Sequence, residues 1–364
     1  METRFNDICN ELDRRGCKVY VLTYQPLITK ARGLSRETRG NITIFRIPWI
    51  GFDLFHKLKP YPVLQALYLC PVLFVRSFVF LLKNHGKIDV IHSAGFNAGL
   101  VGRALKAFFK KRWVVSTHAI YGLNPKSITA RILKWILRRA DVILTLSEPS
   151  RQELIKIGIA PEKLVNQITW VNQEIFKPLD REECRKKLSL KERFTVLFVG
   201  RLLEIKGIRL LAELATEESF RDTDFVFIGA GPLENYLREQ AKAHKNIIFA
   251  GRVENFELPI YYNAADVFVM PSQYKEGLGR VVVEALSCGI PVVASDLGGL
   301  ADILDSSVAI MVNPVKEKIR HSIVYIKSFD KFSFERMRKN ARDFAERVFN
   351  KQNCEVILKA YNFI

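Results

Sequence analysis

Apolar, β-branched runs alternate with amphipathic stretches along the whole chain, and this alternation constrains the fold more than any other feature. The runs lie at Val19–Thr23, Ile42–Ile47, Val90–His92, Trp113–Thr117, Val142–Leu146, Thr195–Val199, Phe225–Ile228, Ile247–Phe249, Val267–Met270, Pro291–Ala294 and Ala309–Val312. Nearly continuous hydrophobic strands separated by helices are typical of parallel sheets that helices cover on both faces. The sequence therefore predicts an α/β protein with doubly wound parallel sheets.

Length and charge distribution both favour two domains. A chain of 364 residues is longer than one hydrophobic core usually supports. Residues 1–180 hold 28 Lys and Arg against 13 Asp and Glu, whereas residues 181–364 hold 28 against 25. We therefore expect an N-terminal domain over 1–175 and a C-terminal domain over 176–345, with different partners. The basic N-terminal half should face something anionic.

Composition and cysteine placement exclude several other classes of protein. Hydrophobic residues make up 48% and charged residues 26% of the chain, which is the globular range and excludes a disordered or fibrous chain. The six cysteines are scattered, without a C-x-x-C pair or a neighbouring His cluster. This argues against a zinc site and a disulfide framework, and predicts a reducing, cytosolic compartment. The first residues do not form a basic-then-apolar signal segment.

The chain opens with a helical pattern rather than a strand. Phe5, Ile8, Cys9 and Leu12 recur at helical spacing, and Gly16 ends the pattern. A doubly wound domain normally begins with a strand and a Gly-rich turn that lead into this helix. The first strand of the N-terminal domain is therefore expected to be absent, through a late start codon or a truncation, which would leave its neighbours in the sheet unpaired.

The segment 63–82 is apolar over a length that reaches the threshold for a membrane-spanning helix. A span would place Arg76 inside the bilayer, and the segment leads directly into the strand that begins at Val90. The sequence therefore favours a helix that is buried in the protein, with a helix lying on a membrane surface as the alternative.

Two basic residues follow the first strand of the second half. The run TVLFVG ends at Gly200, Arg201 comes next, and Lys206-Gly207 precedes a helical pattern. A loop at the carboxyl end of a parallel strand can bring these two cations onto one anion, and a pyrophosphate would suit both. Two solvated loop cations are the structural alternative.

The run PSQYKEGLGRVVVEALSCGIPVVAS contains two carboxylates around a glycine-rich turn. Gly277 and Gly279 lie between Glu276 and a helix that we expect to begin near Arg280. Glycines there would expose backbone N–H groups at a helix N-terminus, where a phosphate binds. Glu284, one turn into the helix, could accept hydrogen bonds from the two hydroxyls of a ribose, and Glu276 could accept them from a group carried by the phosphates.

These residues resemble a known family. The segments GRLLEIKG, FIGAGPLENYL and FAGRVENFELPIYYNAADVFVMPSQYKEGLGRVVVEALSCGIPVVASDLGGLADIL are similar to the C-terminal domain of the retaining glycosyltransferases of family 4. That family has the GT-B fold, in which two Rossmann-like domains face a cleft. The resemblance is strong over about 195–305 and weaker towards both ends. It implies that the C-terminal helix, over 346–364, packs back on the N-terminal domain.

The resemblance implies a donor site for a nucleotide-sugar, UDP- or GDP-linked. Arg201 and Lys206 would hold its diphosphate, Gly277 and Gly279 would donate backbone hydrogen bonds to it, and Glu284 would bind the ribose. Two further elements complete the implied site: Glu276 would contact the transferred sugar, and the turn at Arg252 and Val253 would lie beside the nucleobase.

The implied chemistry needs neither a metal nor a cofactor. Transfer in the family is metal-independent and is proposed to occur with retention on one face of the sugar, the leaving phosphate helping to deprotonate the acceptor. Cationic and dipolar stabilisation of the departing diphosphate is then the main task of the protein. By the same resemblance His118, which follows the strand at Trp113–Thr117, would approach the donor sugar as a catalytic residue.

The predicted function is transfer of a hexosyl group to a lipid-linked or polysaccharide acceptor at the inner face of the membrane. Two basic clusters in the first half suit an anionic membrane: Lys106, Lys110, Lys111 and Arg112, then Arg131, Lys134, Arg138 and Arg139. Nucleic acid is not expected as a partner, because aromatic residues do not interleave these clusters. A nucleotide-sugar hydrolase or epimerase, and a non-catalytic chain that binds nucleotide or membrane, are the alternatives.

Overall fold

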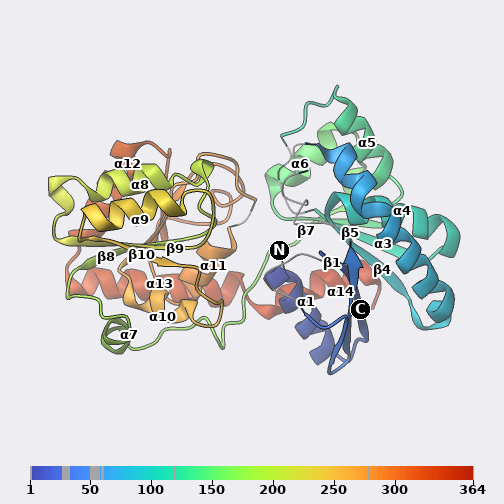
Figure 1. Ribbon diagram of the computed structural model, residues 1–364, viewed down its shortest axis with the longest axis horizontal. Coiled ribbons are helices and arrows are strands. Elements are labelled where there is room, and N and C mark those ends of the chain that lie inside the picture. Colours follow the sequence, from blue (N-terminus) through green and yellow to red (C-terminus); the bar gives the residue numbers. More distant parts are fainter. Residues whose placement is uncertain are drawn as a thin grey trace. The chain divides into compact units, whose positions relative to one another are not determined.

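The computed structural model describes residues 2–26, 33–49, 58, 61–117, 120, 122–277 and 279–363. The chain forms two compact units, which Figure 1 shows. Unit 1 comprises Met1–Gln167 and Gln352–Ile364, and unit 2 comprises Ile168–Lys351. The sequence placed the divisions after 175 and after 345. Each unit has its own sheets, helices and hydrophobic core.

Unit 2 is built on one continuous parallel sheet of six strands. Its strands are β8 (Phe194–Val199), β9 (Thr223–Ile228), β10 (Ile247–Gly251), β11 (Val267–Met270), β12 (Val292–Ser295) and β13 (Ala309–Val312). They lie in the order β10-β9-β8-β11-β12-β13, and every neighbouring pair is parallel. All six coincide with the apolar runs of the second half, because a strand covered on both faces is apolar at nearly every position.

Helices cover both faces of this sheet, as Figure 1 shows. The helices of unit 2 are α7 (Arg181–Lys187), α8 (Ile208–Ala215), α9 (Glu234–Ala243), α10 (Leu258–Ala264), α11 (Arg280–Ser287), α12 (Lys316–Lys327) and α13 (Lys331–Val348). One core cluster joins the sheet to α8, α9 and α12, and the other joins it to α10, α11 and α13. The doubly wound arrangement expected for the second half is therefore confirmed.

Unit 1 holds two smaller sheets instead of one. The strands of unit 1 are β1 (Val19–Pro26), β2 (Arg36–Arg39), β3 (Ile42–Trp49), β4 (Val90–Ala94), β5 (Arg112–Ser116), β6 (Val142–Thr145) and β7 (Leu164–Asn166). One sheet has the order β1-β3-β2, and the other is the parallel sheet β4-β5-β6-β7. Among the described residues, β1 and β4 each pair with a strand on one side only.

The sequence did not predict β2 or β7. β2 reads Arg-Glu-Thr-Arg, pairs antiparallel with β3 and is largely exposed, so it carries no apolar pattern. Charged residues on an edge strand discourage pairing with another chain. β7 is three residues long, too short for a periodicity to be recognised.

The helices of unit 1 include one long apolar helix. They are α1 (Glu2–Arg14), α3 (Pro62–Asn84), α4 (Gly95–Phe109), α5 (Ile128–Leu137), α6 (Glu148–Lys156) and α14 (Cys354–Tyr361). α14 comes from the end of the chain and contacts α1 and β5. α3 contains the apolar segment 63–82, and only 22% of its most apolar stretch is buried. The expectation that this helix is buried in the protein is therefore wrong.

Candidate active site

The strand order of the six-stranded sheet reverses between β8 and β11. From β8 the chain continues to β9 and β10 on one side, then crosses to β11, β12 and β13 on the other. In open α/β sheets, ligands bind at such a switch point, outside the carboxyl ends of the strands. The loops that follow β8 and β11 therefore flank the position where this fold binds ligands.

An ion pair joins these two loops. Lys206 ends the short 3-10 turn Glu204–Lys206 after β8, and its Nζ contacts Oε1 of Glu276 in the loop after β11. Ser272 Oγ donates a hydrogen bond to the same Oε1 over 2.8 Å. The ammonium group also lies 5.0 Å from the ring centre of Tyr274. The side chains of Lys206 and Glu276 are 15% and 12% exposed, so solvent reaches the pair.

Two glycines allow the backbones of these loops to approach closely. Gly207 has a φ of 70°, and a Cβ there would lie 2.1 Å from the carbonyl oxygen of Pro271. Gly298 has a φ of 103°, and a Cβ there would lie 2.0 Å from the carbonyl oxygen of Glu276. Any larger residue at either position would displace the loop that carries Glu276. The geometry of the ion pair therefore depends on both glycines.

Arg201 lies at the same edge of the sheet. It is exposed and has no acidic partner in the part of the chain that the structure describes. The backbone before it is fixed, because the Gly200 N–H donates to the carbonyl oxygen of Ile228 over 3.0 Å. A Cβ on Gly229 would lie 1.8 Å from the Gly200 carbonyl oxygen, so the turns after β8 and β9 are packed together. Among the described residues, Arg201 thus offers a cation without an acidic partner on a closely packed turn.

The glycine-rich turn leads into α11 as the sequence predicted. α11 begins at Arg280, with Gly279 as its N-cap residue, and Gly277 lies two residues earlier. Leu278, between them, is outside the described residues. A Cβ on Gly279 would lie only 3.0 Å from Met270 Sδ. The start of α11 is therefore packed closely against the end of β11. The positive end of the helix dipole therefore lies beside the loop that carries Glu276.

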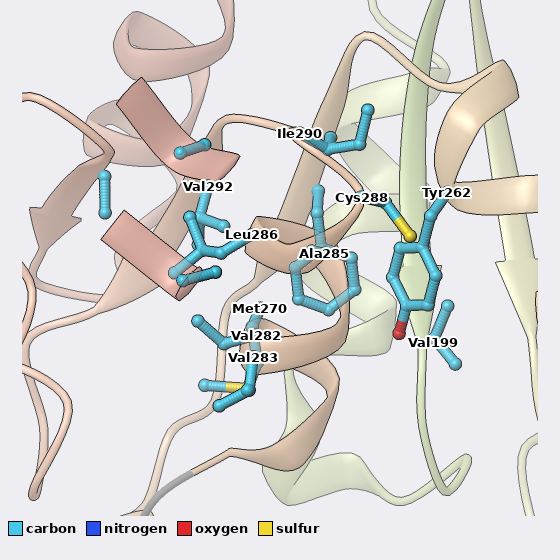
Figure 2. Close-up of a cluster of buried hydrophobic side chains, with 14 of the residues drawn as sticks. Val199, Tyr262, Met270, Val282, Val283, Ala285, Leu286, Cys288, Ile290 and Val292 are labelled. Carbon is cyan, nitrogen blue, oxygen red and sulfur yellow. The ribbon is translucent and has the colours of Figure 1, made fainter. Parts of the chain in front are cut away.

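Glu284 is buried and hydrogen-bonded within unit 2. Its carboxylate accepts hydrogen bonds from Tyr262 Oη over 3.0 Å, Arg280 Nε over 2.9 Å and Asn255 Nδ2 over 3.4 Å, and its side chain is 2% exposed. Burial raises the pKa of Glu284, and Arg280 and the other donors oppose that rise. Figure 2 shows Tyr262 in the same cluster of buried side chains as residues of α11. Ribose binding by Glu284 stays a prediction.

Arg252 and Val253 follow β10, two strands from β8 in the sheet. Arg252 is exposed, and its Nη2 lies 3.7 Å from Oε1 of Glu254. Val253 instead packs against the core of unit 2. They lie at the same edge as Arg201, beyond the turn after β9. Their proximity to a nucleobase stays a prediction.

His118 lies outside the described residues, so its predicted role is not addressed by the structure. Among the described residues of unit 1, the half-buried ring of His92 forms a hydrogen bond on each side. Its Nε2 lies 2.7 Å from Ser116 Oγ and its Nδ1 lies 2.6 Å from Tyr361 Oη. Burial, together with the charge of Arg4, lowers the pKa of His92 to about 4. The neutral ring therefore links β4, β5 and α14 inside unit 1.

The structure thus brings together Lys206 and Glu276, and it places Arg201, Gly277 and Gly279 at the same edge of the sheet. It also shows two contacts that the sequence did not predict, because Ser272 bonds to Glu276 and the ring of Tyr274 lies beside Lys206. Both lie in the run PSQYKEG, so their proximity to Glu276 along the chain was the available signal. No group of three or more potential metal-ligating side chains occurs among the residues described.

Family models match both halves of the chain. The model described as "Glycosyl transferases group 1" matches residues 180–360, and the model described as "Glycosyltransferase Family 4" matches residues 1–165. An uncharacterized 41.2 kDa protein in the cps region of Klebsiella pneumoniae is 27% identical over 290 residues, covering 76% of this chain and 79% of that protein. The putative teichuronic acid biosynthesis glycosyltransferase TuaC of Bacillus subtilis is 38% identical over 177 residues. The match covers 48% of this chain and 43% of that protein.

Solved structures share the fold at low sequence identity. Sucrose-phosphate synthase from Thermosynechococcus elongatus matches with a TM-score of 0.79 at 22% identity, covering 99% of this chain and 92% of that one. Anabaena HepE in complex with UDP-glucose matches with a TM-score of 0.71 at 17% identity, and the match covers 94% of this chain and 98% of that one. Seven further curated relatives are matched over 34% to 64% of their own length.

Proposed function

This chain belongs to the family 4 glycosyltransferases, and from that membership we propose that it moves a hexosyl group from a nucleotide diphosphate sugar to a lipid-linked or polysaccharide acceptor. We propose further that the anomeric configuration is retained and that no metal ion takes part. The alternatives raised by the sequence, a nucleotide-sugar hydrolase or epimerase and a non-catalytic binder, predict different products and are separated by the assay below.

The pairing of Lys206 with Glu276 at the switch point, at the sheet edge that also carries Arg201, is the observation that supports this proposal most directly. Two cations and the N-terminus of α11 at one edge of a sheet suit a ligand with two negative phosphates. When a diphosphate is bound, Lys206 would pair with it, and Glu276 would be released to accept a hydrogen bond from a sugar hydroxyl. Anabaena HepE, a structural neighbour, was solved with UDP-glucose.

The proposed reaction uses the protein as an electrostatic template. The bond between the anomeric carbon and the diphosphate oxygen breaks, and the bond to the acceptor oxygen forms on the same face of the sugar. The proton of the acceptor hydroxyl passes to the departing phosphate, so charge is balanced without a protein nucleophile. Arg201, Lys206 and the first N–H groups of α11 would stabilise the negative charge that develops on the diphosphate. His118 is proposed to contact the donor sugar.

The acceptor and location are proposed from charge and from the names of relatives. The excess of Lys and Arg in residues 1–180 suits an anionic membrane surface, and we place the chain in the cytoplasm at the inner face of the membrane. Relatives are named for a cps region and for teichuronic acid biosynthesis. These names support a role in making a cell-envelope polysaccharide or glycolipid.

A thermal-shift titration of the full chain with UDP, GDP, ADP and CMP tests the donor site. One nucleoside diphosphate should raise the melting temperature, because a ligand at a hundredfold excess over its dissociation constant adds about 2.7 kcal/mol to the stability. Arg201→Ala should remove the shift. Arg221→Ala is the matched control, because Arg221 is exposed in the same unit and its ion pair is with the surface residue Glu218. A shift that survives Arg201→Ala would contradict the assigned site.

Incubation with the sugar form of that nucleotide then separates the three functions. Transfer predicts that nucleoside diphosphate is released only when an acceptor extract is added. Free sugar or an isomeric sugar formed without acceptor would show a hydrolase or an epimerase. Binding without any turnover, with acceptor present, would favour the non-catalytic alternative.

A further inference from the structure

The outer face of α3 is more apolar than a soluble helix normally presents. Val63, Leu64, Leu67, Val75, Val79 and Leu82 are all exposed, and Leu67 is 67% exposed. Two of the residues on its buried side, Gln65 and Ser77, are polar. A surface helix usually turns its apolar side to the core and its charged side to water. In α3 this arrangement is partly reversed.

The neighbouring helices extend the same apolar surface. α4 packs between α3 and α5, as Figure 1 shows, and both neighbours contact it. Phe108 of α4 lies against Phe74 and Phe78 of α3 and is 65% exposed. We call the following exposed residues the α3–α5 face: Val63, Leu64, Leu67, Val75, Val79, Leu82, Phe108, Ile128, Ile132 and Trp135. Apolar patches of this extent mark sites of interaction.

A groove of about 700 Å³ runs through this face. Its walls are Leu67, Pro71 and Phe74 of α3, the side of α4 from Phe96 to Ala107, and Ile132 and Trp135 of α5. The stretch of α4 along it spans about 16 Å at 1.5 Å per residue. Its lining is almost entirely hydrocarbon and aromatic, so a flexible hydrocarbon chain fits its length and its chemistry.

The charges on this face have one sign. α3, α4 and α5 contain no Asp or Glu. Arg103, in the wall of the groove, stacks 3.9 Å from the ring centre of Trp135 and has no carboxylate partner among the described residues. Burial lowers the pKa of Arg103, and the charges of Arg138 and Arg139 lower it further. An anion placed beside Arg103 would relieve this repulsion.

Exposed basic residues border the face at α5. Arg131, Lys134, Arg138 and Arg139 are all exposed on or just after α5. The other basic cluster, at residues 106–112, already has partners within unit 1 for two of its side chains. Lys106 pairs with Asp141, and Arg112 donates a hydrogen bond to the carbonyl oxygen of Ala360. Aromatic and aliphatic side chains bordered by Lys and Arg are typical of helices that lie at an anionic membrane surface.

We propose that the α3–α5 face docks on an anionic phospholipid bilayer, with α3 lying along the surface and the groove taking the acyl chain of one lipid whose phosphate meets Arg103. This deepens the proposed function, on which it rests only for the presence of a membrane-borne acceptor. We place α3 along the surface rather than across the bilayer, because its Cys70 and Leu81 pack with Val101 and Leu105 of α4 on one side. A second copy suits the face less well, because two surfaces of like charge would meet.

Co-sedimentation of the full chain with vesicles tests the proposal without donor or acceptor. The chain should bind vesicles of phosphatidylcholine mixed with phosphatidylglycerol, and bind phosphatidylcholine alone much less. Added salt should weaken the binding, because exposed charges are screened. Trp135 supplies a second readout: on binding, its fluorescence should shift to the blue and be quenched by lipids brominated on the acyl chain. Trp135→Phe should abolish that signal without abolishing sedimentation.

Two variants separate the apolar and electrostatic contributions. Leu67→Glu should lower vesicle partitioning at least tenfold, since it places a negative charge in the groove mouth on a side chain that does not support the core. Arg131→Ala and Lys134→Ala should each lower it about fivefold. Phe332→Glu is the matched control, because Phe332 is 75% exposed at the start of α13 in unit 2. It should bind as the unmodified chain does.

Three results would overturn the proposal. They are equal binding to both kinds of vesicle, unchanged binding of Leu67→Glu, and a dimer in light scattering that Leu67→Glu converts to a monomer. The last would show that a second copy covers the face. If the chain binds vesicles but transfers no sugar, the proposed function is refuted and this inference stands. If it transfers sugar but does not bind vesicles, this inference is refuted and the proposed function stands.

Discussion

The two units of this molecule place their apolar residues in opposite ways. Unit 2 encloses its strands and the inner sides of its helices in two core clusters, one on each face of a single six-stranded sheet. Unit 1 divides its strands between two sheets and leaves the outer side of α3 exposed. Unit 2 also has nearly balanced charge, whereas residues 1–180 carry a large basic excess.

This difference suits the two kinds of ligand that we propose for the units. Residues at the edge of a rigid sheet are held within fractions of an ångström, which suits a small, highly charged donor. A broad apolar face with exposed basic side chains has no such requirement and suits an extended, fluid partner. Substitutions in unit 2 should therefore act through geometry, and substitutions on the α3–α5 face should act through surface chemistry alone.

Gly207→Ala should break the geometry of unit 2 and have the largest effect. The added Cβ would lie 2.1 Å from the Pro271 carbonyl oxygen at a φ of 70°, so the loop bearing Glu276 must move. We expect a loss of about 3 to 5 kcal/mol in the free energy of unfolding of unit 2, measured by hydrogen exchange resolved by peptide. Gly251→Ala is the control, since Gly251 has the same φ but open space around its Cβ position. If both variants lose the same free energy of unfolding, the close approach of Gly207 to the Pro271 carbonyl oxygen does not determine the effect.

Lys206→Ala tests whether the charge at the switch point acts on the donor. Removing one stabilising group from a developing oxyanion typically lowers kcat by about 10² to 10³. We expect a decrease of that size in sugar transfer, measured with saturating acceptor, and little change in the stability of unit 2. Lys242→Ala, which removes an exposed lysine from α9, should leave transfer unchanged. An equally active Lys206→Ala enzyme would remove this residue from the site.

The sequence predicted the strands of unit 2 better than those of unit 1 for a physical reason. The six strands of unit 2 are buried on both faces, so each is a continuous apolar run. In unit 1 the exposed strand β2 and the short strand β7 have no such run. The apolar pattern of α3 was recognised, but composition cannot tell which side of a helix faces the core. Only the structure shows that its outer side is exposed.

The sequence predicted which loops carry the candidate site residues, but it did not predict the contacts that these residues make. Spacing placed Arg201, Lys206 and Glu276 after parallel strands, and parallel strands end at one edge. The burial of Glu284 by Tyr262, Arg280 and Asn255 could not be deduced, because Tyr262 and Asn255 belong to a different part of the chain. Hydrogen bonds between distant segments depend on side-chain packing, which no local pattern encodes.

His92 provides a pH test that should affect unit 1 and not unit 2. Its pKa is lowered from an ordinary 6.5 to about 4 by burial, so the folded protein keeps the ring neutral while the unfolded chain protonates it. Stability from this group is complete above pH 6.5 and is lost as the pH falls towards 4. The shift corresponds to a loss of about 3 kcal/mol in the free energy of unfolding of unit 1. Urea denaturation at a series of pH values measures it.

His92→Asn separates this effect from general acid denaturation. The variant should be less stable at neutral pH, because it loses the hydrogen bonds to Ser116 and Tyr361. Its stability should nevertheless fall less steeply with decreasing pH than that of the unmodified chain. If both chains show the same pH slope, carboxylates elsewhere determine the acid sensitivity of unit 1.

The smallest effect is expected for Leu67→Ala, and it bears most directly on the contrast between the units. Leu67 is 67% exposed on α3, so truncating it should change the free energy of unfolding by less than about 0.5 kcal/mol. Leu237→Ala in α9 is the matched substitution in unit 2, where Leu237 is fully buried and its loss should cost about 2 to 5 kcal/mol. A stability loss at Leu67 comparable with that at Leu237 would mean that another part of the protein covers α3 in solution. A neutral result at Leu67 would leave the apolar side chain without a role in folding, and its role would then have to lie in contact with a partner.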